Sequence, residues 1–477
     1  MAQPTALVWF RRDLRLGDNP ALAAACALGG QVIPVYIDAP EEEGAWPPGA
    51  ASRWWQHHSL AALDSGLKKR NSRLIVRQGP SHKALGQLAE ETSATHIFWN
   101  RRYEPAVIKR DQAIKQQLRA AGLTVKSTNA LLLFEPWEIA KNDGMPYRIF
   151  TPFWKTCLEK GIGRSPFPPP QHLPPVNRQL QSEPLSTLGL LPKIPWDQEF
   201  YTHWTPGEAG AWRQWECFLE EALGKYHQER DRPDLPGTSR LSPHLHFGEI
   251  SPRQIAFQIQ IQMDRRAELT AGGQAYLRQL GWREFAYHLL YHFPETPEKP
   301  LNEGFTHFPW AEDYGEALTA WQQGRTGIPL VDAGMRELWR TGWMHNRVRM
   351  IAASLLTKNL RIPWQEGERW FWETLVDADL ASNTLGWQWV AGCGADAAPY
   401  FRVFNPVLQG KKFDPEGKYV QQWIPELRKI SKQHIHEPWK EARQPLSTPG
   451  SVGGQSGAWG VRSRNVLFPY DNPKIHR

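Results

Sequence analysis

Apolar and polar positions alternate in short blocks over the first 127 residues. The runs "ALVWF", "QVIPVYI", "RLIVRQG", "THIFWN" and "LTVKS" have the length of buried strands, and the stretches between them have helical periodicity. Pro105 suits the first turn of one such helix. This alternation predicts a five-stranded parallel sheet wrapped by helices, which is a Rossmann-like α/β domain over residues 1–130.

The pattern changes twice further along the chain. Residues 160–206 are rich in Pro and poor in periodic apolar positions, so we interpret 131–206 as an interdomain linker. Over 207–430 apolar residues recur at helical spacing and strand signals are nearly absent, which predicts a larger all-α domain. Residues 431–477 include a Gly- and Ser-rich stretch and are expected to form an atypical, partly flexible C-terminal tail.

The composition limits the class of protein. A chain of 477 residues is too long for one compact core, and 41% apolar with 22% charged residues suits a folded, soluble protein. No run of about 18 apolar residues occurs, so no membrane span is expected, and the early charges of "MAQPTALVWFRRD" argue against a secretory signal. Four cysteines lie far apart without a CxxC pair, which indicates a reducing, cytoplasmic location rather than a disulfide framework: Cys26, Cys157, Cys217 and Cys393.

Two further numbers concern ligands. The formal charge of +7 permits an anionic partner but does not establish one. The chain also contains 24 tryptophans, although Leu or Phe would fill a core as well. Tryptophans in this number indicate stacking on planar ligands, redox chemistry or an aromatic core, and the composition leaves all three open.

Several widespread catalytic motifs are missing from the sequence. It contains no GxxxxGK[ST], HExxH or GxSxG, which argues against a P-loop, a zinc protease and a nucleophile elbow. The segment "GCGADA" (392–397) has the spacing of a dinucleotide fingerprint, but it follows a Trp-rich helical stretch rather than a strand. His244 and His246 have too few neighbouring ligands for zinc, so we expect packing or capping roles and no metal site.

The segment "DADLASNTLGWQW" (377–389) combines two acids, an amide and two indoles. On one continuous helix, Asp379, Asn383 and Trp387 would share a face and Asp377 would point elsewhere, so the acids would not converge as a catalytic pair. The apolar flanks predict burial, and buried polar groups need partners. A carboxylate, an amide and an indole in a row therefore favour a bound planar heterocycle over a solvated helix face.

Two other segments fit a ligand site. "PGTSRLS" (236–242) places hydroxyls and an Arg in a turn before a helix, where backbone amides bind phosphate well, although an ordinary capping turn has the same composition. "WMHNRVRM" (343–350) places Asn346, Arg349 and Met350 on neighbouring helical positions.

These segments, together with "FRRDLRLGDNPAL", "WREF", "GRTGIPLVDAGMRELWRTG" and "FRVFNP", resemble the DNA photolyase/cryptochrome family over roughly residues 5–440. The likeness is greatest to bacterial cyclobutane pyrimidine dimer photolyases. It implies an FAD held in the helical domain, with Asn383 facing flavin N5 and favouring the reduced flavin. The residues that it implies for FAD are Tyr226, Thr238, Ser239, Arg240, Leu241, Ser242, Tyr276, Arg283, Asn346, Arg349, Asp377, Asp379 and Asn383.

The resemblance also implies the activity and the partner. Photoexcited reduced FAD would pass an electron to a cyclobutane pyrimidine dimer in DNA, the ring would split, and the electron would return. Trp310, Trp364 and Trp387 match the family's electron-transfer chain, and the protein is expected to act as a monomer without membrane contact. The residues that match the DNA- and lesion-facing positions are Arg230, Gln279, Trp282, Arg283, Asn346, Arg347, Met350, Trp389, Arg402, Gln409 and Lys412.

Three departures from the family pattern keep alternatives open. Gln279 stands where dimer-specific photolyases usually carry Glu, which leaves a blue-light photoreceptor with weak or no repair as the alternative function. Val107 replaces the acid that some relatives use for a folate, so a folate bound elsewhere, a deazaflavin, a flavin and no antenna chromophore all remain open. The C-terminal tail matches neither photolyases nor the long extensions of many cryptochromes.

Overall fold

The computed structural model describes residues 3–397, 399 and 402–441. Its sheet consists of β1 (Thr5–Phe10), β2 (Gln31–Asp38), β3 (Ile75–Gln78), β4 (His96–Asn100) and β5 (Thr124–Thr128), in the order β3-β2-β1-β4-β5. Every neighbouring pair is parallel, with β1 at the centre between β2 and β4. The predicted five-stranded parallel sheet is therefore confirmed.

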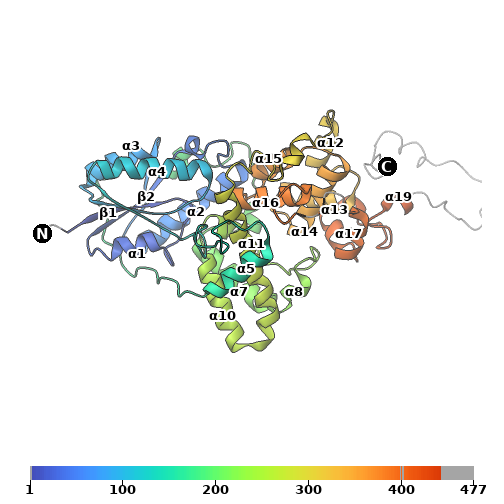
Figure 1. The fold of residues 1–477 in the computed structure, drawn as a ribbon, viewed down its shortest axis with the longest axis horizontal. Coiled ribbons are helices and arrows are strands. Elements are labelled where there is room, and N and C mark those ends of the chain that lie inside the picture. Colours follow the sequence, from blue (N-terminus) through green and yellow to red (C-terminus); the bar gives the residue numbers. More distant parts are fainter. Residues whose placement is uncertain (1–2, 398, 400–401, 442–477) are drawn as a thin grey trace, which may run out of the picture.

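Helices cover both faces of this sheet (Figure 1). In β1, alternate residues Val8 and Phe10 pack with α1 (Pro20–Cys26) and α2 (Ala50–Lys68). Leu7 and Trp9 point the other way and pack with α3 (Ser81–Thr92) and α4 (Pro105–Ala120), which begins at Pro105 as predicted. This alternation follows from the two-residue period of a strand, and burial on both faces explains its continuous apolar run.

The rest of the described chain is helical, and no strand follows β5 within it. The elements are α5 (Phe150–Lys160), α6 (Phe200–His203), α7 (Glu208–Glu221), α8 (Tyr226–Glu229), α9 (Ser242–His246), α10 (Pro252–Arg265), α11 (Thr270–His292), α12 (Gly315–Gln322), α13 (Pro329–Thr341), α14 (Asn346–Ser354) with a π-helix at Leu355–Asn359, α15 (Trp364–Thr374), α16 (Leu380–Ala391), α17 (Pro406–Phe413), α18 (Lys418–Trp423) and α19 (Pro438–Glu441).

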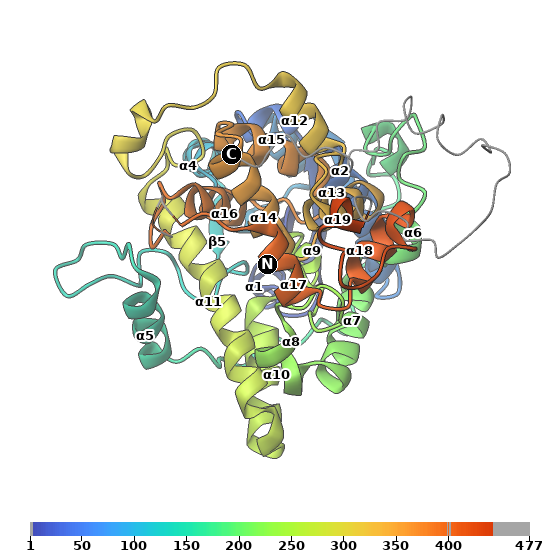
Figure 2. The same cartoon turned by 90° about the vertical axis from the view of Figure 1, so that its right-hand side faces the viewer.

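Helix α16 lies beside α14 and α15 in this helical region (Figure 2). It packs against α11, α14 and α15, and their apolar side chains form one continuous core. The sheet domain is attached at this core, because α2 contacts α15 and α7. A buried hydrogen bond from Trp55 Nε1 to Glu249 Oε1, 3.0 Å long, fixes the contact. The helical region and the sheet domain thus share a buried contact.

The expected linker and the expected C-terminal tail are the remaining segments. The expected linker, 131–206, contains the ordered helix α5, whose Phe150, Phe153 and Trp154 are buried against α11. The expected tail falls mainly on residues 442–477, which lie outside the described residues, and its described part ends in α19. None of the described helices is long and apolar enough to span a membrane.

Candidate functional site

The segment 377–389 is not one helix, and this corrects the predicted stripe. Helix α15 ends at Thr374, and α16 begins only at Leu380. Asp379 is the N-cap residue of α16 and accepts a hydrogen bond from Ser382 N at 2.9 Å, a position that Asp strongly favours. Because the residues before the cap do not follow the helical rotation, Asp377 does not point away but lines the same cavity as Asp379.

This first cavity has a volume of about 150 Å³ and lies between α14, α15 and α16. Arg349 crosses one side, where its Nη2 donates to both carboxylate oxygens of Asp377 at 2.9 and 3.0 Å and its Nε donates to the Met344 carbonyl. Gly386 lines the cavity, and no other atom would lie within 4 Å of a Cβ at this position. The polar side chains that line it include those predicted: Asn346, Arg349, Asp377, Asp379 and Asn383.

Asp379 is the most strongly held charge at the cavity. Its Oδ2 accepts from the Tyr287 hydroxyl, and His246 Nδ1 lies 3.4 Å away. Burial alone would raise the pKa of the Asp379 carboxyl, but His246, the charge of Arg283 and Tyr287 outweigh burial and hold that pKa well below its usual range. Burial lowers the pKa of His246 to about 4.

Asn383 lies one helical turn after Asp379 and is oriented by its neighbour on α15. Its Nδ2 donates to the main-chain carbonyl of Glu368 at 3.0 Å, which leaves the carbonyl oxygen of the amide for a ligand. The Glu368 side chain is fully buried, and its Oε1 accepts from the Thr384 hydroxyl at 2.7 Å. Burial raises the pKa of the Glu368 carboxyl well above its usual value.

The three predicted electron-transfer tryptophans belong to the core around this cavity. Trp387 and Trp364 are buried in it, and Trp310 packs against it half-exposed. Trp387 lies directly on the α15 backbone, since a Cβ at Gly367 would be 2.0 Å from its ring. The segment of Trp310 is tied to the start of α15 by the 2.7 Å bond from Ala311 N to the Arg361 carbonyl. Trp387 thus lines the cavity, whereas Trp310 reaches the surface.

The turn at 236–242 is held by hydrogen bonds to α11 and to Trp343, which precedes α14. Ser239 Oγ hydrogen-bonds Tyr276 Oη at 2.7 Å, and the rings of Tyr276 and Tyr226 pack 5.1 Å apart. Ser242 Oγ accepts from Trp343 Nε1 at 3.3 Å. The predicted phosphate turn therefore brings Tyr226, Ser239, Ser242 and Tyr276 together, while Leu241 is fully buried below them.

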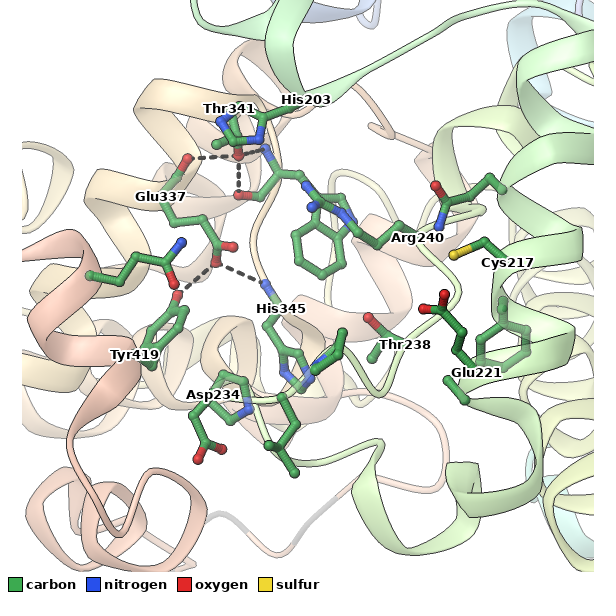
Figure 3. Close-up of a pocket in the computed structure, with 18 of the residues that line it drawn as sticks. His203, Cys217, Glu221, Asp234, Thr238, Arg240, Glu337, Thr341, His345 and Tyr419 are labelled. Atoms are coloured by element: carbon green, nitrogen blue, oxygen red, sulfur yellow. Dashed lines mark hydrogen bonds between the residues drawn. The ribbon is translucent and has the colours of Figure 1, made fainter.

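Arg240 and Thr238 extend their side chains into a second, separate cavity of about 360 Å³ (Figure 3). Arg240 has a positive φ of 52°, and its guanidinium lies 4.6 Å from the Trp204 ring and 4.8 Å from the Trp343 ring. Glu337 lines the same cavity and accepts from Tyr419 Oη at 2.6 Å. Any contact of Arg240 with a ligand in the first cavity would therefore involve its main chain.

Two pairs of the predicted DNA-facing residues have defined contacts in the structure. Arg347 pairs with Asp231 at 2.8 Å, and Arg347 and Lys412 both lie over the Phe413 ring, at 4.6 and 5.2 Å. Asn346 and Met350 are at the first cavity itself. The other members are half-buried or exposed: Arg230, Gln279, Trp282, Trp389, Arg402 and Gln409.

Arg283 does not reach outward as a DNA contact would. Its Nη1 donates to the Leu131 carbonyl at 2.8 Å, and its guanidinium lies 5.0 Å from the Tyr287 ring. Through this position it contributes to the low pKa of Asp379. Arg283 was predicted both for FAD and for DNA, and its position fits the FAD set.

A third cavity, of about 140 Å³, lies at the carboxyl ends of β1 and β2. Sheets of this kind usually bind ligands at this edge, next to the point where the strand order reverses. Five arginines line it, Arg11, Arg12, Arg53, Arg102 and Arg110, and Arg102 donates to both carboxylate oxygens of Glu43. Val107 stands at the position where an acid was expected for a folate, and its side chain is fully buried in α4.

The sequence prediction missed three residues that contact the lining of the first cavity. His246 was expected only to pack or cap, and both it and His244 are buried, but His246 also contacts Asp379. Tyr287 lies in the apolar run of α11, and Glu368 is a single acid within the Trp-rich α15. A buried acid on an otherwise apolar helix face was the available signal for Glu368. Tyr287 and His246 carried no comparable signal.

Comparisons with known proteins agree with this geometry. The chain matches the models "DNA photolyase" over residues 6–172 and "FAD binding domain of DNA photolyase" over residues 276–455. It is 48% identical to a deoxyribodipyrimidine photo-lyase of Agrobacterium fabrum, over 94% of this chain and 93% of that protein. It is 42% identical to cryptochrome-2 of Arabidopsis thaliana, over 93% of this chain and 74% of that protein.

The fold agrees as well. The crystal structure of a bacterial class III photolyase from Agrobacterium tumefaciens matches with a TM-score of 0.87 at 48% identity, over 92% of this chain and 90% of that chain. These findings confirm the predicted resemblance, fold class and FAD cofactor, and they support the expected photo-lyase type of enzyme. The chain belongs to the DNA photolyase/cryptochrome family.

Proposed function

We propose that the protein repairs cyclobutane pyrimidine dimers in DNA by light-driven electron transfer. Asn346, Arg349, Asp377, Asp379 and Asn383 would hold FAD at the first cavity, and the reduced cofactor would supply the light-driven electron chemistry of the repair. The residues of this chain hold that cofactor, orient it and exclude water. The observation that carries the proposal is the fixed amide of Asn383, whose free oxygen is an acceptor for a flavin N5–H.

The remaining polar groups of the cavity divide the binding task. Asp379 is an ionised acceptor for N–H or hydroxyl donors of the cofactor, and Tyr287, His246 and Ser382 fix its position. The bidentate contact of Asp377 with Arg349 supplies a neutralised pair at the cavity wall. Gly386 leaves room for a flat ring to approach α16. A reduced cofactor would be bound without a large uncompensated charge.

The proposed DNA face surrounds the first cavity. The indoles of Trp282 and Trp389 are half-exposed and pack against two different apolar cores. Leu385 of α16 packs against both of these cores. Aromatic side chains of this kind stack on extruded bases, and extrusion costs least for a damaged pair. Arg347 and Lys412 are suited to phosphate contacts, which supply affinity that falls with salt.

Binding measurements test this proposal directly. The protein should bind dimer-containing DNA more tightly than undamaged DNA, and both affinities should fall as salt rises. Lys412→Ala should reduce the slope of log affinity against log salt by about 1, because one phosphate contact is lost. Lys68→Ala, an exposed lysine of α2 in the sheet domain, is the matched control and should leave the slope unchanged. Equal affinity for damaged and undamaged DNA would contradict the proposal.

An antenna chromophore is proposed for the third cavity, at the carboxyl edge of the sheet. Trp9, Tyr36 and Arg102 offer a planar or anionic ligand both aromatic and cationic contacts. A folate and a deazaflavin both fit that chemistry. An absorption spectrum of the purified protein, compared with that of an Arg102→Ala variant, would show whether a second chromophore is bound there.

A second candidate function is blue-light signalling without efficient repair. Gln279, half-buried on α11, supports it, since an amide does not supply the charge of the usual Glu. The likeness to a plant cryptochrome is consistent with this alternative. It predicts weak discrimination of damaged DNA and light-dependent binding of a protein partner.

A further inference from the structure

One face of the Trp282 indole is covered by another aromatic ring. The rings of Trp282 and Phe150 lie parallel, with centroids 3.8 Å apart and an interplanar angle of 6°. Phe150 is fully buried at the start of α5, whereas Trp282 on α11 is half-exposed. The indole therefore rests with one face on a fully buried ring, and part of it still reaches the surface.

The surrounding contacts impose this geometry. Aromatic pairs usually prefer an offset or edge-to-face arrangement, so a nearly eclipsed pair reflects the packing around it. Phe285 packs edge-on against both rings, 5.9 Å from each centroid. Trp154 presses α5 against α11, because a Cβ at Gly281 would lie 2.5 Å from its ring. Neither Phe150 nor Trp282 can tilt freely within this packing.

Polar groups also hold Phe150 at the start of α5. Phe150 N donates to Asp396 Oδ2 at 3.3 Å, and the Arg278 guanidinium lies 4.9 Å from the Phe150 ring. Arg278 and Trp282 are four residues apart on α11 and thus share a helix face. Phe150 is held both by its own main chain and by the face of α11 that carries Trp282.

We infer that Phe150 is a positioning residue for lesion recognition: it holds the Trp282 ring in one plane so that a flipped pyrimidine dimer stacks on the remaining face. This inference rests on the proposed repair function. Ordering a free side chain during binding weakens affinity, and a preformed platform avoids this loss. The benefit should appear only with damaged DNA, because undamaged DNA does not insert a base against Trp282.

Substitution of Phe150 tests the inference. Phe150→Leu removes the flat ring and should weaken binding of a dimer-containing oligonucleotide by about fivefold, the effect of ordering one side chain. Affinity for the undamaged oligonucleotide and the repair yield per photon at saturating DNA should stay unchanged. Phe150→Met, of similar volume, provides the same test if the Leu variant folds poorly. Phe153→Leu is the matched control on α5, since the ring contacts of Phe153 are with Tyr147, Phe285 and His288.

A double-mutant cycle separates positioning from general packing. In a Trp282→Leu background, Phe150→Leu should have no further effect on dimer affinity, because its role passes through Trp282. Equal losses in both backgrounds, or tighter dimer binding by Phe150→Leu, would overturn the inference. Absence of any preference for dimer-containing DNA in the wild type would overturn the proposed function instead, so the two failures are distinguishable.

Discussion

Asn383 donates a hydrogen bond from Nδ2 to the main-chain carbonyl of Glu368, 3.0 Å away on the neighbouring helix. Asp at this position would place a carboxylate oxygen against that carbonyl and a negative charge beside a cofactor that must hold an electron. We expect Asn383→Asp to make the flavin potential more negative by about 60 mV, equal to about 1.4 kcal/mol for one electron. A spectroscopic redox titration measures this shift.

A control for this substitution is available on α17. Asn405→Asp makes the same chemical change at a helix N-cap outside the first cavity, where Asn405 accepts from Val407 N and Leu408 N. Asp serves equally well as an N-cap, so the potential should not change. A shift of equal size in both variants would argue against a specific role for Asn383.

Trp387 is expected to begin the electron relay to the surface. Trp387→Phe keeps the packing against Phe371 and Gly367 but removes the easily oxidised indole. Blue light with an external reductant should then reduce oxidised flavin far more slowly, as followed by the loss of its absorbance. Trp99→Phe, a buried tryptophan of the sheet, should leave the rate unchanged. Unaltered photoreduction in Trp387→Phe would rule out this relay.

Gln279 is the residue on which repair efficiency is expected to depend. Gln279→Glu restores a charged acceptor for a pyrimidine imide N–H, and hydrogen bonds to charged groups contribute about 1.5–3 kcal/mol. Dimer binding should tighten by about tenfold and the repair yield should rise, as measured by binding titration and by dimer loss per absorbed photon. A variant that repairs no better than the wild type would show that Gln279 already serves as an adequate acceptor.

Buried histidines make stability depend on pH. Burial lowers the pKa of His288 from 6.5 to about 4, and its ring contacts Tyr147 N and the Pro136 carbonyl. Between these values the unfolded chain binds the proton and the folded chain does not. The contribution of His288 to stability is therefore present above pH 6.5 and is lost as pH falls towards 4, by about 1.4 kcal/mol per pH unit.

The measurement compares wild type with His288→Gln by urea unfolding at several pH values. Opposing groups such as Glu284 and Glu337, whose burial raises their pKa to about 7, are present in both proteins and cancel in the difference. The advantage of the wild type should shrink between pH 6.5 and 4. A pH-independent difference would show that His288 titrates alike in both states.

Patterns along the chain predicted the sheet and most helices, because strand alternation and helical periodicity are local properties. The break between α15 and α16 was missed, since the apolar residues on both sides of Asp377 suit a continuous helix. The Asp379 cap was its local sign. Once the break is placed, both acids reach the cavity, and the predicted separation of Asp377 from Asp379 proves wrong.

Contacts between distant parts of the chain could not be predicted in this way. Tyr287 lies 92 positions from Asp379, and no periodicity connects a tyrosine on one helix with a cap on another. The direction of Arg240 depends on the positive φ of a tight turn and on two indoles from other segments. The stack of Phe150 on Trp282 likewise joins an expected linker to a predicted binding residue.

Light-dependent loss of dimers from irradiated oligothymidine tests the central claim most directly. The FAD-loaded, reduced protein under blue light should remove cyclobutane dimers and restore the intact thymines, whereas the same sample in the dark should not. Loss of dimers under light that depends on reduced flavin is the predicted result. Dimers that persist under blue light, with FAD bound and reduced, would contradict the account.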